Sequence, residues 1–451
     1  MFDYKLINGK LINEGCITEQ DLAIKQGRIA RIDKNLSALP ARVTMDLQGQ
    51  YLMPGMIDDQ VHFREPGLMH KGDIFTESRA AVAGGITSYM EMPNTNPPTL
   101  SAADLQAKKH RASKKSLANY AFYLGTSTTN LEEVKRISHK DACGVKIFMG
   151  SSTGNMCIDD PELLAQFFAN APILVATHCE DDQLIKQQLA YYKERYGERV
   201  PPTLHPYIRS HQACYQSSQL AVSLAKRYQT KLHVLHMTTA NELQLFQSGS
   251  HQDKSITLEA CVHHLFFNES DYPRLGNAIK CNPAIKQKVD QQALIAAVNN
   301  NTLDVIATDH APHSRQEKQQ AYLQAPAGLP LVQHALLSLF ALHEQGHFAL
   351  TTIVNKACHA PADIYGVQER GYIREGYWAD LTVMDMNRPY YVHQGNIAYK
   401  CGWSPFLGYR FPTRVAYTFV NGKLAYEDVD GHRHRHGQIH EVGSGQALEF
   451  N

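Results

Sequence analysis

The stretch "CGVKIFMGSSTGNMCIDDPELLAQFFANAPILVATH" at residues 143–178 contains the repeating unit that decides the fold. Two short apolar runs, at 143–149 and 172–178, flank the segment 161–170, which has the pattern of an amphipathic helix. Strand-like runs that alternate with helical segments are typical of a parallel sheet covered by helices. This stretch therefore predicts one strand–helix–strand unit.

The same alternation continues on both sides of this stretch. We identify eight apolar runs in all, at 56–63, 85–92, 118–123, 143–149, 172–178, 231–236, 255–262 and 303–308. Eight successive strands, most of them followed by a helical segment, are typical of a closed (β/α)8 barrel of the TIM type. The sequence thus predicts an α/β protein whose barrel domain spans residues 57–365.

The two ends of the chain have a different pattern. Residues 1–56 and 366–451 contain short strand-like runs, and the dipeptides Asn8-Gly9 and Asn421-Gly422 are typical of hairpin turns. We expect these two segments to form one small, β-sandwich-like accessory domain, which the chain leaves and later re-enters. The histidine-rich stretch 431–440 is interpreted as a solvated strand or loop.

Composition excludes several classes of protein. Of the 451 residues, 43% are hydrophobic and 20% are charged, which is typical of a globular chain and not of a disordered one. The 44 basic residues balance the 44 acidic ones, which argues against a nucleic-acid partner. No apolar run reaches the ~18 residues of a membrane span. Nine cysteines without a CxxC pair fit reduced thiols, so we expect a cytoplasmic protein.

Residues that can bind metal stand at the ends of the predicted strands, where a barrel of this type holds its catalytic groups. His178 and His236 end two of the runs, and Asp309 follows a third. Lys146 lies inside a fourth run, where a charged amine is costly to bury unless it is paired or chemically altered. A buried lysine, an aspartate and histidines on different strands together indicate a metal centre.

Together with these residues, longer motifs carry a family resemblance. The stretches "PGMIDDQVHFREPG", "EMPNTNPP", "GVKIFMGSSTGN", "LHVLHMTT" and "IATDHAPH" occur in that order, and "APAGLP" and "GYWADLTVMD" follow. With them the chain resembles the amidohydrolase superfamily and, more closely, the dihydroorotases, over nearly its whole length. The resemblance implies a metal-dependent enzyme of pyrimidine biosynthesis that reversibly hydrolyses (S)-dihydroorotate to N-carbamoyl-L-aspartate.

The resemblance also implies a metal-binding set. Lys146 matches the lysine that becomes N6-carboxylated and bridges two divalent metals, usually Zn²⁺. His178 and His236 match ligands of the more exposed metal, and His62 matches a ligand of the more buried one. Asp309 matches a ligand that also acts as general base and then general acid.

One position departs from the superfamily pattern. The usual first-strand signature is His-x-His, whereas here Gln60 stands in place of the first histidine. An amide oxygen is a poorer zinc ligand than imidazole. The buried site is either completed by Gln60 or water, or left empty, so two Zn²⁺ per subunit are expected with one as the alternative.

The resemblance further implies substrate contacts. Arg64 matches the residue that grips the substrate carboxylate, which a planar guanidinium pairs through two hydrogen bonds. The remaining contacts implied with the small-molecule substrate are made by Asn94, Asn282, His313, Ala327 and Gly328.

Two alternatives stay open. A hydantoinase- or allantoinase-like cyclic amidase would share the metal ligands but should lack the "FREPG" and "MPNT" pair, because its substrates carry no matching carboxylate. A non-catalytic scaffold that binds a partner such as aspartate carbamoyltransferase is supported by Gln60 alone. The family also implies a homo-oligomer, with a dimer favoured.

Overall fold

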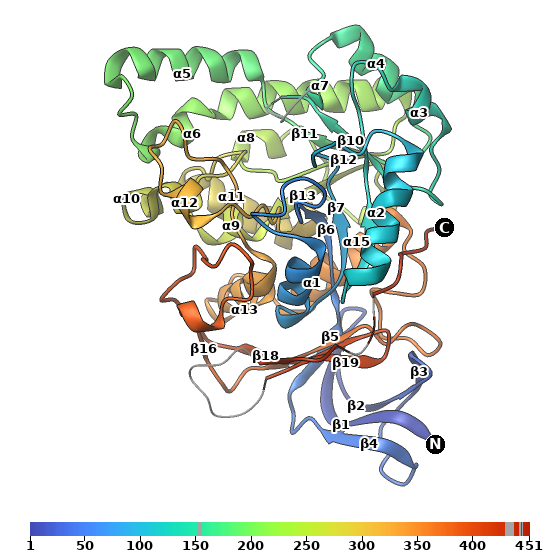
Figure 1. Ribbon diagram of the computed structural model, residues 1–451. Helices are drawn as coiled ribbons and strands as arrows, with labels where there is room; N and C mark the ends of the chain where they lie inside the picture. Colours follow the sequence, from blue (N-terminus) through green and yellow to red (C-terminus); the bar gives the residue numbers. More distant parts are fainter. Residues whose placement is uncertain (151–155, 429–436, 442, 444) are drawn as a thin grey trace.

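The predicted barrel runs form parallel strands in the computed structural model, which describes residues 1–150, 156–428, 437–441, 443 and 445–451 (Figure 1). Each of the eight runs contains one strand, and a further short strand begins directly after the run at 118–123. The barrel strands are β6 (Met56–Val61), β7 (Ile86–Glu91), β8 (Asn119–Phe122), β9 (Leu124–Gly125), β10 (Val145–Phe148), β11 (Val175–His178), β12 (Leu232–Val234), β13 (Ile256–Cys261) and β14 (Val305–Ala307).

The barrel closes through two parallel sheets. One has the order β6-β7-β8, and the other runs from β9 to β14 in chain order. They meet on one side at Tyr123, where the chain changes partner: β8 pairs with β7, and β9 pairs with β10. On the other side the N–H of His62 donates to the carbonyl of His310 at 2.7 Å. Each barrel strand therefore has a neighbouring strand on both sides, and the barrel is closed.

Helices surround these strands (Figure 1). Because both faces of a barrel strand are covered, its residues are buried without alternation, and all residues of β7 and β10 are buried, including the polar Glu91 and Lys146. The α-helices are α1 (Ile74–Ala83), α2 (Ala102–Lys115), α3 (Leu131–Arg136), α4 (Pro161–Asn170), α5 (Asp182–Tyr196), α6 (His205–Ile208), α7 (His211–Tyr228), α8 (Ala240–Leu243), α9 (Val262–Phe266), α10 (Tyr272–Leu275), α11 (Lys288–Asn299), α12 (Arg315–Lys318), α13 (Ala335–Glu344), α14 (Leu350–Val354) and α15 (Ala360–Tyr365).

The N-terminal and C-terminal strands share a second sheet, which lies at the lower end of the molecule in Figure 1. The contact between the two chain ends is β5, which pairs in parallel with β1 and antiparallel with β15. The strands of this sheet are β1 (Phe2–Asn13), β2 (Cys16–Lys25), β3 (Arg28–Asp33), β4 (Ala41–Asp46), β5 (Tyr51–Pro54), β15 (Leu381–Asp385), β18 (Arg414–Val420), β19 (Lys423–Glu427) and β20 (Gln438–Ile439), and a separate ribbon joins β16 (Tyr390–Tyr391) to β17 (Arg410–Phe411).

The two predicted hairpin turns have different outcomes. Asn421-Gly422 joins β18 to β19, with both residues at positive φ, as a tight two-residue turn requires. The prediction at Asn8-Gly9 is wrong, because β1 continues through it. Asn8 has a φ of 57°, and the register to β2 shifts there, so the dipeptide forms a bulge instead. The chain reverses later, between Asn13 and Cys16, which are paired.

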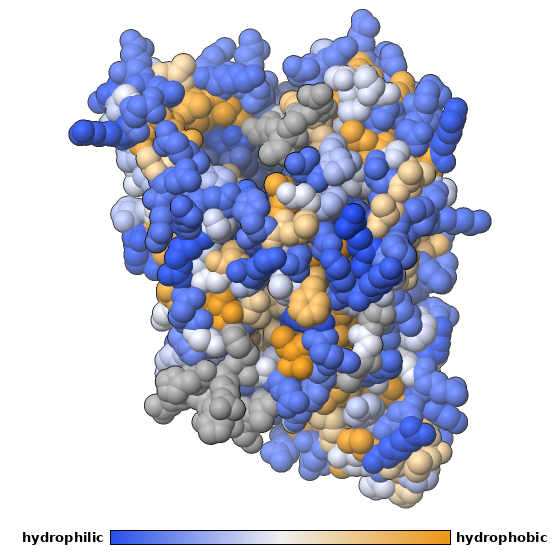
Figure 2. Space-filling view, in the orientation of Figure 1, coloured by the Kyte–Doolittle hydropathy of each residue, from blue (hydrophilic) through white to orange (hydrophobic). Residues whose placement is uncertain are grey.

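On the face shown in Figure 2, hydrophobic side chains are scattered among hydrophilic ones and form no single large patch. No helix within the described part of the chain is long and apolar enough to cross a membrane. All nine cysteines are free thiols. Most of the histidine-rich stretch 431–440 lies outside the described residues.

Candidate metal and substrate site

One cavity of about 470 Å³ gathers the residues that the sequence singles out. Gln60, Lys146 and His178 lie within barrel strands, and the others lie in the loops beyond the strand ends, so distant parts of the chain meet at this cavity. All twelve predicted site residues line this cavity: Gln60, His62, Arg64, Asn94, Lys146, His178, His236, Asn282, Asp309, His313, Ala327 and Gly328.

Part of this set fits a divalent cation. Nδ1 of His178 lies 3.0 Å from Nε2 of His236, the separation expected of two nitrogens that bind one ion through bonds of ~2.0–2.1 Å. The Nζ atom of Lys146 is buried and has no hydrogen-bond partner among the described residues. A carboxylated lysine would replace this unpartnered amine with an anionic oxygen ligand. The arrangement therefore suits the metals that the sequence implies.

Burial prepares these groups for metal binding. It lowers the pKa of Lys146 to about 7 and lowers the pKa values of His178 and His236 below their usual range. At neutral pH the imidazoles are therefore neutral, which is the form that binds metal. Burial also favours the unprotonated amine of Lys146, and only this form can react with carbon dioxide.

Gln60 faces the predicted general base. Its Nε2 donates to Oδ1 of Asp309 at 3.2 Å, and Nε2 of His62 lies 3.0 Å from the same oxygen. The amide oxygen of Gln60 is instead 3.9 Å from the thiol of Cys261. Gln60 thus orients Asp309 through its nitrogen, while its role as a metal ligand stays a prediction.

The other wall of the cavity is polar and partly cationic. Nε of Arg64 donates to the carbonyl of Pro312 at 3.0 Å, which fixes the plane of the guanidinium. Burial lowers the pKa of Arg64 to about 10, so the side chain is still cationic at neutral pH. Lys71 donates to Nδ1 of His313 at 3.0 Å, and Nε2 of His313 lies 2.9 Å from the carbonyl oxygen of Ala327 and 3.1 Å from Nη2 of Arg64.

The two amides among the predicted substrate contacts differ in their partners. Oδ1 of Asn94 contacts Nδ1 of His62 at 2.7 Å, which leaves its amide nitrogen for other contacts. Oδ1 of Asn282 is buried and has no hydrogen-bond partner among the described residues. An unpartnered oxygen in a cavity wall is an acceptor for an N–H group of a ligand.

Comparison with known proteins places these observations in a family. The model of the amidohydrolase family matches residues 51–425, which is most of the chain. The chain belongs to the amidohydrolase family. A dihydroorotase from Bacillus cytotoxicus is 30% identical over 442 residues, with 94% of this chain and 98% of the relative covered. A dihydroorotase from Methanothermobacter thermautotrophicus is 29% identical over 433 residues, with 95% of each chain covered.

Solved structures show the same fold. An L-hydantoinase (dihydropyrimidinase) from Arthrobacter aurescens superposes with a TM-score of 0.91 at 24% identity, with each chain covered fully. A dihydropyrimidinase from Brevibacillus agri NCHU1002 gives a TM-score of 0.87 at 21% identity, with 100% of this chain and 99% of that chain covered. The sequence relatives confirm the predicted resemblance to the dihydroorotases. The solved structures confirm the predicted barrel fold. Together with the family match, the relatives show that the chain is a cyclic amidohydrolase.

Sequence reasoning missed a carboxylate of this amidohydrolase that supports a predicted ligand. Nε2 of His178 lies 2.9 Å from Oε2 of Glu180, and Nη2 of Arg209 lies 2.8 Å from the same oxygen. Burial opposes ionisation, but Arg209 and His178 hold the pKa of Glu180 at about 2. A carboxylate behind a metal-binding histidine orients its ring. The available signal was an acid two residues after His178.

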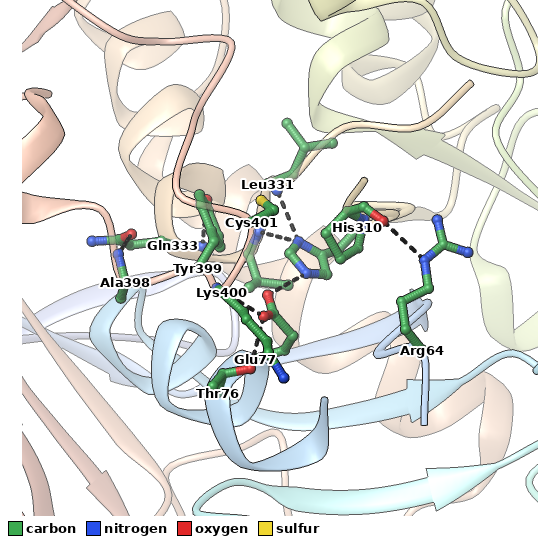
Figure 3. Close-up of polar contacts among 12 residues, drawn as sticks. Arg64, Thr76, Glu77, His310, Leu331, Gln333, Ala398, Tyr399, Lys400 and Cys401 are labelled. Carbon is green, nitrogen blue, oxygen red and sulfur yellow. Dashed lines mark hydrogen bonds and ion pairs between the residues drawn. The ribbon is translucent and has the colours of Figure 1, made fainter. Parts of the chain in front are cut away.

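A second group that was missed supports the end of β14 (Figure 3). Leu331 donates its N–H to Nδ1 of His310 at 2.9 Å, so Nε2 of His310 is protonated and donates to Glu77 of α1 at 2.9 Å. The other oxygen of Glu77 accepts the N–H of Lys400 at 3.1 Å. His310 follows Asp309 directly, so these contacts hold the backbone beside Asp309, the predicted general base, in place.

Three site residues have left-handed backbones. The φ angles are 70° at Arg64, 39° at His236 and 50° at Asp309. Non-glycine residues rarely adopt such angles, and positions that do cluster at functional sites. Each of the three follows the end of a barrel strand, where the turn directs its side chain into the cavity.

Proposed function

We propose that this amidohydrolase is a dihydroorotase, which reversibly hydrolyses the cyclic amide of (S)-dihydroorotate to N-carbamoyl-L-aspartate. The observation that carries the proposal is the position of Arg64 in the same cavity as the metal-binding set. A buried guanidinium beside a hydrolytic centre suits a ring that carries a carboxylate. The relatives named dihydroorotase, at 29% and 30% identity over nearly the whole chain, support it.

In this proposal the metal site is built from Lys146 in its N6-carboxylated form together with His62, His178, His236 and Asp309, and Zn²⁺ is the metal. Bound divalent metal lowers the pKa of water and polarises the scissile carbonyl. Two ions per subunit are proposed. One ion is the alternative, because Gln60 directs its nitrogen and not its oxygen at Asp309.

The side chains of the protein supply positioning and proton transfer. Arg64, Asn94 and His313 hold the carboxylate, and Asn282 and the backbone of Ala327 and Gly328 face the ring amides. Asp309 accepts a proton from the attacking water and passes it to the leaving ring nitrogen. Fixing the carboxylate on one side of the cavity sets the distance between the scissile carbonyl and the metal site.

The test is steady-state hydrolysis of L-dihydroorotate by the purified chain, with zinc and bicarbonate or with chelator. Hydantoin, allantoin and dihydrouracil serve as rings without the carboxylate. We expect chelator-sensitive turnover of dihydroorotate and at least ~10-fold lower kcat/KM for the other rings, because one charged hydrogen bond is worth ~1.5–3 kcal/mol. A preference for hydantoin or allantoin would establish the cyclic amidase alternative instead.

Absence of turnover in both directions would favour the non-catalytic scaffold, and binding to aspartate carbamoyltransferase would then be measured. We further propose that the enzyme works as a homodimer in the cytoplasm. Light scattering of the purified chain tests the dimer, because a single-chain mass would exclude it.

A further inference from the structure

Three buried side chains converge inside the barrel, away from the strand ends. Asp59 lies in β6, His233 in β12 and Glu259 in β13, and none of the three is exposed to solvent. One ligand atom from each lies within 4.8 Å of the others. The candidate active site instead lies at the strand ends, where Gln60 of β6 lines its cavity together with His62 and His236, which follow β6 and β12.

The hydrogen bonding of this cluster is incomplete. Within the described residues, neither side-chain oxygen of Asp59, nor Oε2 of Glu259, nor Nε2 of His233 has a hydrogen-bond partner. Nε2 of His233 lies 3.2 Å from an oxygen of Asp59 and 4.0 Å from an oxygen of Glu259. Buried carboxylates are costly unless a cation or several hydrogen bonds compensate them. Apart from the contacts of His233 with the two carboxylates, these atoms therefore have no partner among the described residues.

The far side of the His233 ring is already held. Its Nδ1 lies 2.7 Å from Oγ1 of Thr257, and this hydroxyl donates to the carbonyl of Leu232 at 3.4 Å. With the hydroxyl hydrogen directed at the carbonyl, Nδ1–H of His233 donates to Thr257. Nε2 then keeps a lone pair that faces the two carboxylates. Histidines that bind metal usually donate their other N–H in this way.

We propose that Asp59, His233 and Glu259 bind one divalent ion of the first transition series, with Zn²⁺ as the probe. Two carboxylates balance the charge of such an ion, and the second oxygen of Asp59 can supply a fourth ligand atom. Because all three residues are fully buried, the site is closed to substrate. Closed sites of this kind are structural, whereas catalytic sites keep an open position.

The proposed ion would also support the active site. Oε1 of Glu259 accepts the backbone N–H of His236 at 2.9 Å and the thiol of Cys261 at 3.2 Å. An ion at Oε2 would hold this carboxylate, and through it the end of β12, in a single position. The ion thus joins β6, β12 and β13 behind the metal-binding residues. This inference does not depend on which ring the enzyme hydrolyses.

A proton is the competing occupant. Burial and the charge of Asp59 raise the pKa of Glu259 well above its usual value, so Glu259 could carry a proton where no cation is present. The two occupants differ in electron density and in metal content. Both differences can be measured without an activity assay.

Crystals of the full-length chain grown with Zn²⁺ decide between them. Diffraction above and below the zinc absorption edge should give an anomalous peak ~2.0–2.2 Å from the ligand atoms of Asp59, His233 and Glu259. A peak at Lys146 and His178 with none between these three residues would overturn the proposal.

Metal content gives an independent test in solution. Lys146→Met weakens the predicted catalytic centre, and Lys146→Met combined with Asp59→Asn should hold one zinc ion fewer per chain than Lys146→Met alone. The matched control adds Glu242→Gln, which changes a buried carboxylate that already accepts from Ser218 and Thr239. Equal zinc content in all three proteins would contradict the proposal, and if the Asp59 variant fails to fold, the crystal test decides.

Discussion

In the proposed function, Arg64 is the residue that binds the substrate carboxylate. Its guanidinium is held by the carbonyl of Pro312, so two parallel hydrogen bonds to a carboxylate need little reorganisation. Arg64→Lys keeps the positive charge but loses the planar guanidinium with its two parallel N–H donors. We expect kcat/KM for dihydroorotate to fall ~10–100-fold, corresponding to ~1.5–3 kcal/mol.

The measurement for Arg64 is a comparison of rings. Hydrolysis of a ring without the carboxylate should change little in Arg64→Lys. The matched control is Arg79→Lys on α1, which removes an arginine that pairs with Glu441 outside the cavity. If kcat/KM falls equally for dihydroorotate and for the uncharged ring, Arg64 does not bind the carboxylate.

Lys146 has a pKa of about 7, and this value sets a pH dependence for assembly of the metal site. Below pH 7 the amine becomes protonated and cannot react with carbon dioxide. We therefore expect the reactivation rate of metal-free chain, at fixed dissolved carbon dioxide and zinc, to fall ~10-fold per pH unit below 7 and to level off above 8. A rate that rises steeply up to pH 10 would show an ordinary lysine.

Glu180 is predicted to act through His178 and not on the substrate. Glu180→Gln removes the anionic acceptor of the His178 N–H and leaves Arg209 without its partner. Zinc affinity, measured by competition with a chelator, should fall ~10–100-fold. Glu198→Gln, which changes an exposed carboxylate on the loop after α5, should leave it unchanged. Equal zinc affinity in both variants would show that Glu180 does not support metal binding.

At the scale of elements, helix α1 supports the end of β14 through a single carboxylate. Glu77 accepts hydrogen bonds from His310 and from the N–H of Lys400, and all of its contacts are lost in Glu77→Ala (Figure 3). Because buried donors are then left without an acceptor, the free energy of unfolding should fall by ~3 kcal/mol. Urea denaturation measures it.

The control for α1 is a carboxylate on another helix. Glu132→Ala on α3 removes an exposed pair with Lys135 and should not change stability measurably. If Glu77→Ala is as stable as this control, the link between α1 and β14 does not contribute to folding.

At the scale of the whole molecule, Asp380 joins the barrel to the shared sheet. Its carboxylate accepts hydrogen bonds from Asn119 of β8 at 3.0 Å and from the N–H of Asn421 at 2.7 Å, and it pairs with the buried Arg370. Asp380→Ala leaves a buried arginine unpaired, so unfolding should become easier by ~3–5 kcal/mol.

Asp380→Ala should lower the free energy of unfolding without changing the catalytic reaction. At low temperature the folded Asp380→Ala chain should keep its kcat/KM, because Asp380 is not among the residues that line the cavity. Asp33→Ala, which changes an exposed carboxylate of β3, should not alter stability. A loss of kcat/KM without a loss of stability would contradict this division.

Local sequence was sufficient for the strands and for some residues of the cavity. A barrel strand is buried on both faces, so its run is mostly apolar and can be recognised without knowing its neighbours. The carboxyl ends of parallel strands meet at one end of a barrel, which is why metal-capable residues at these ends, such as Lys146, His178 and Asp309, were expected to lie together. Asn282, Ala327 and Gly328, which line the same cavity, were predicted only from the family resemblance. The turn at Asn421-Gly422 was predicted from local sequence.

Tertiary structure alone decided the contacts between elements. Asn8-Gly9 has the same turn signal as Asn421-Gly422, yet it lies within a strand that pairs on both sides with β2 and β4. The partners of His178 and His310, and the cluster of Asp59, His233 and Glu259, depend on which strands and helices are adjacent. Periodicity reports whether a position is buried, but not which side chain it faces, because that depends on packing across the barrel.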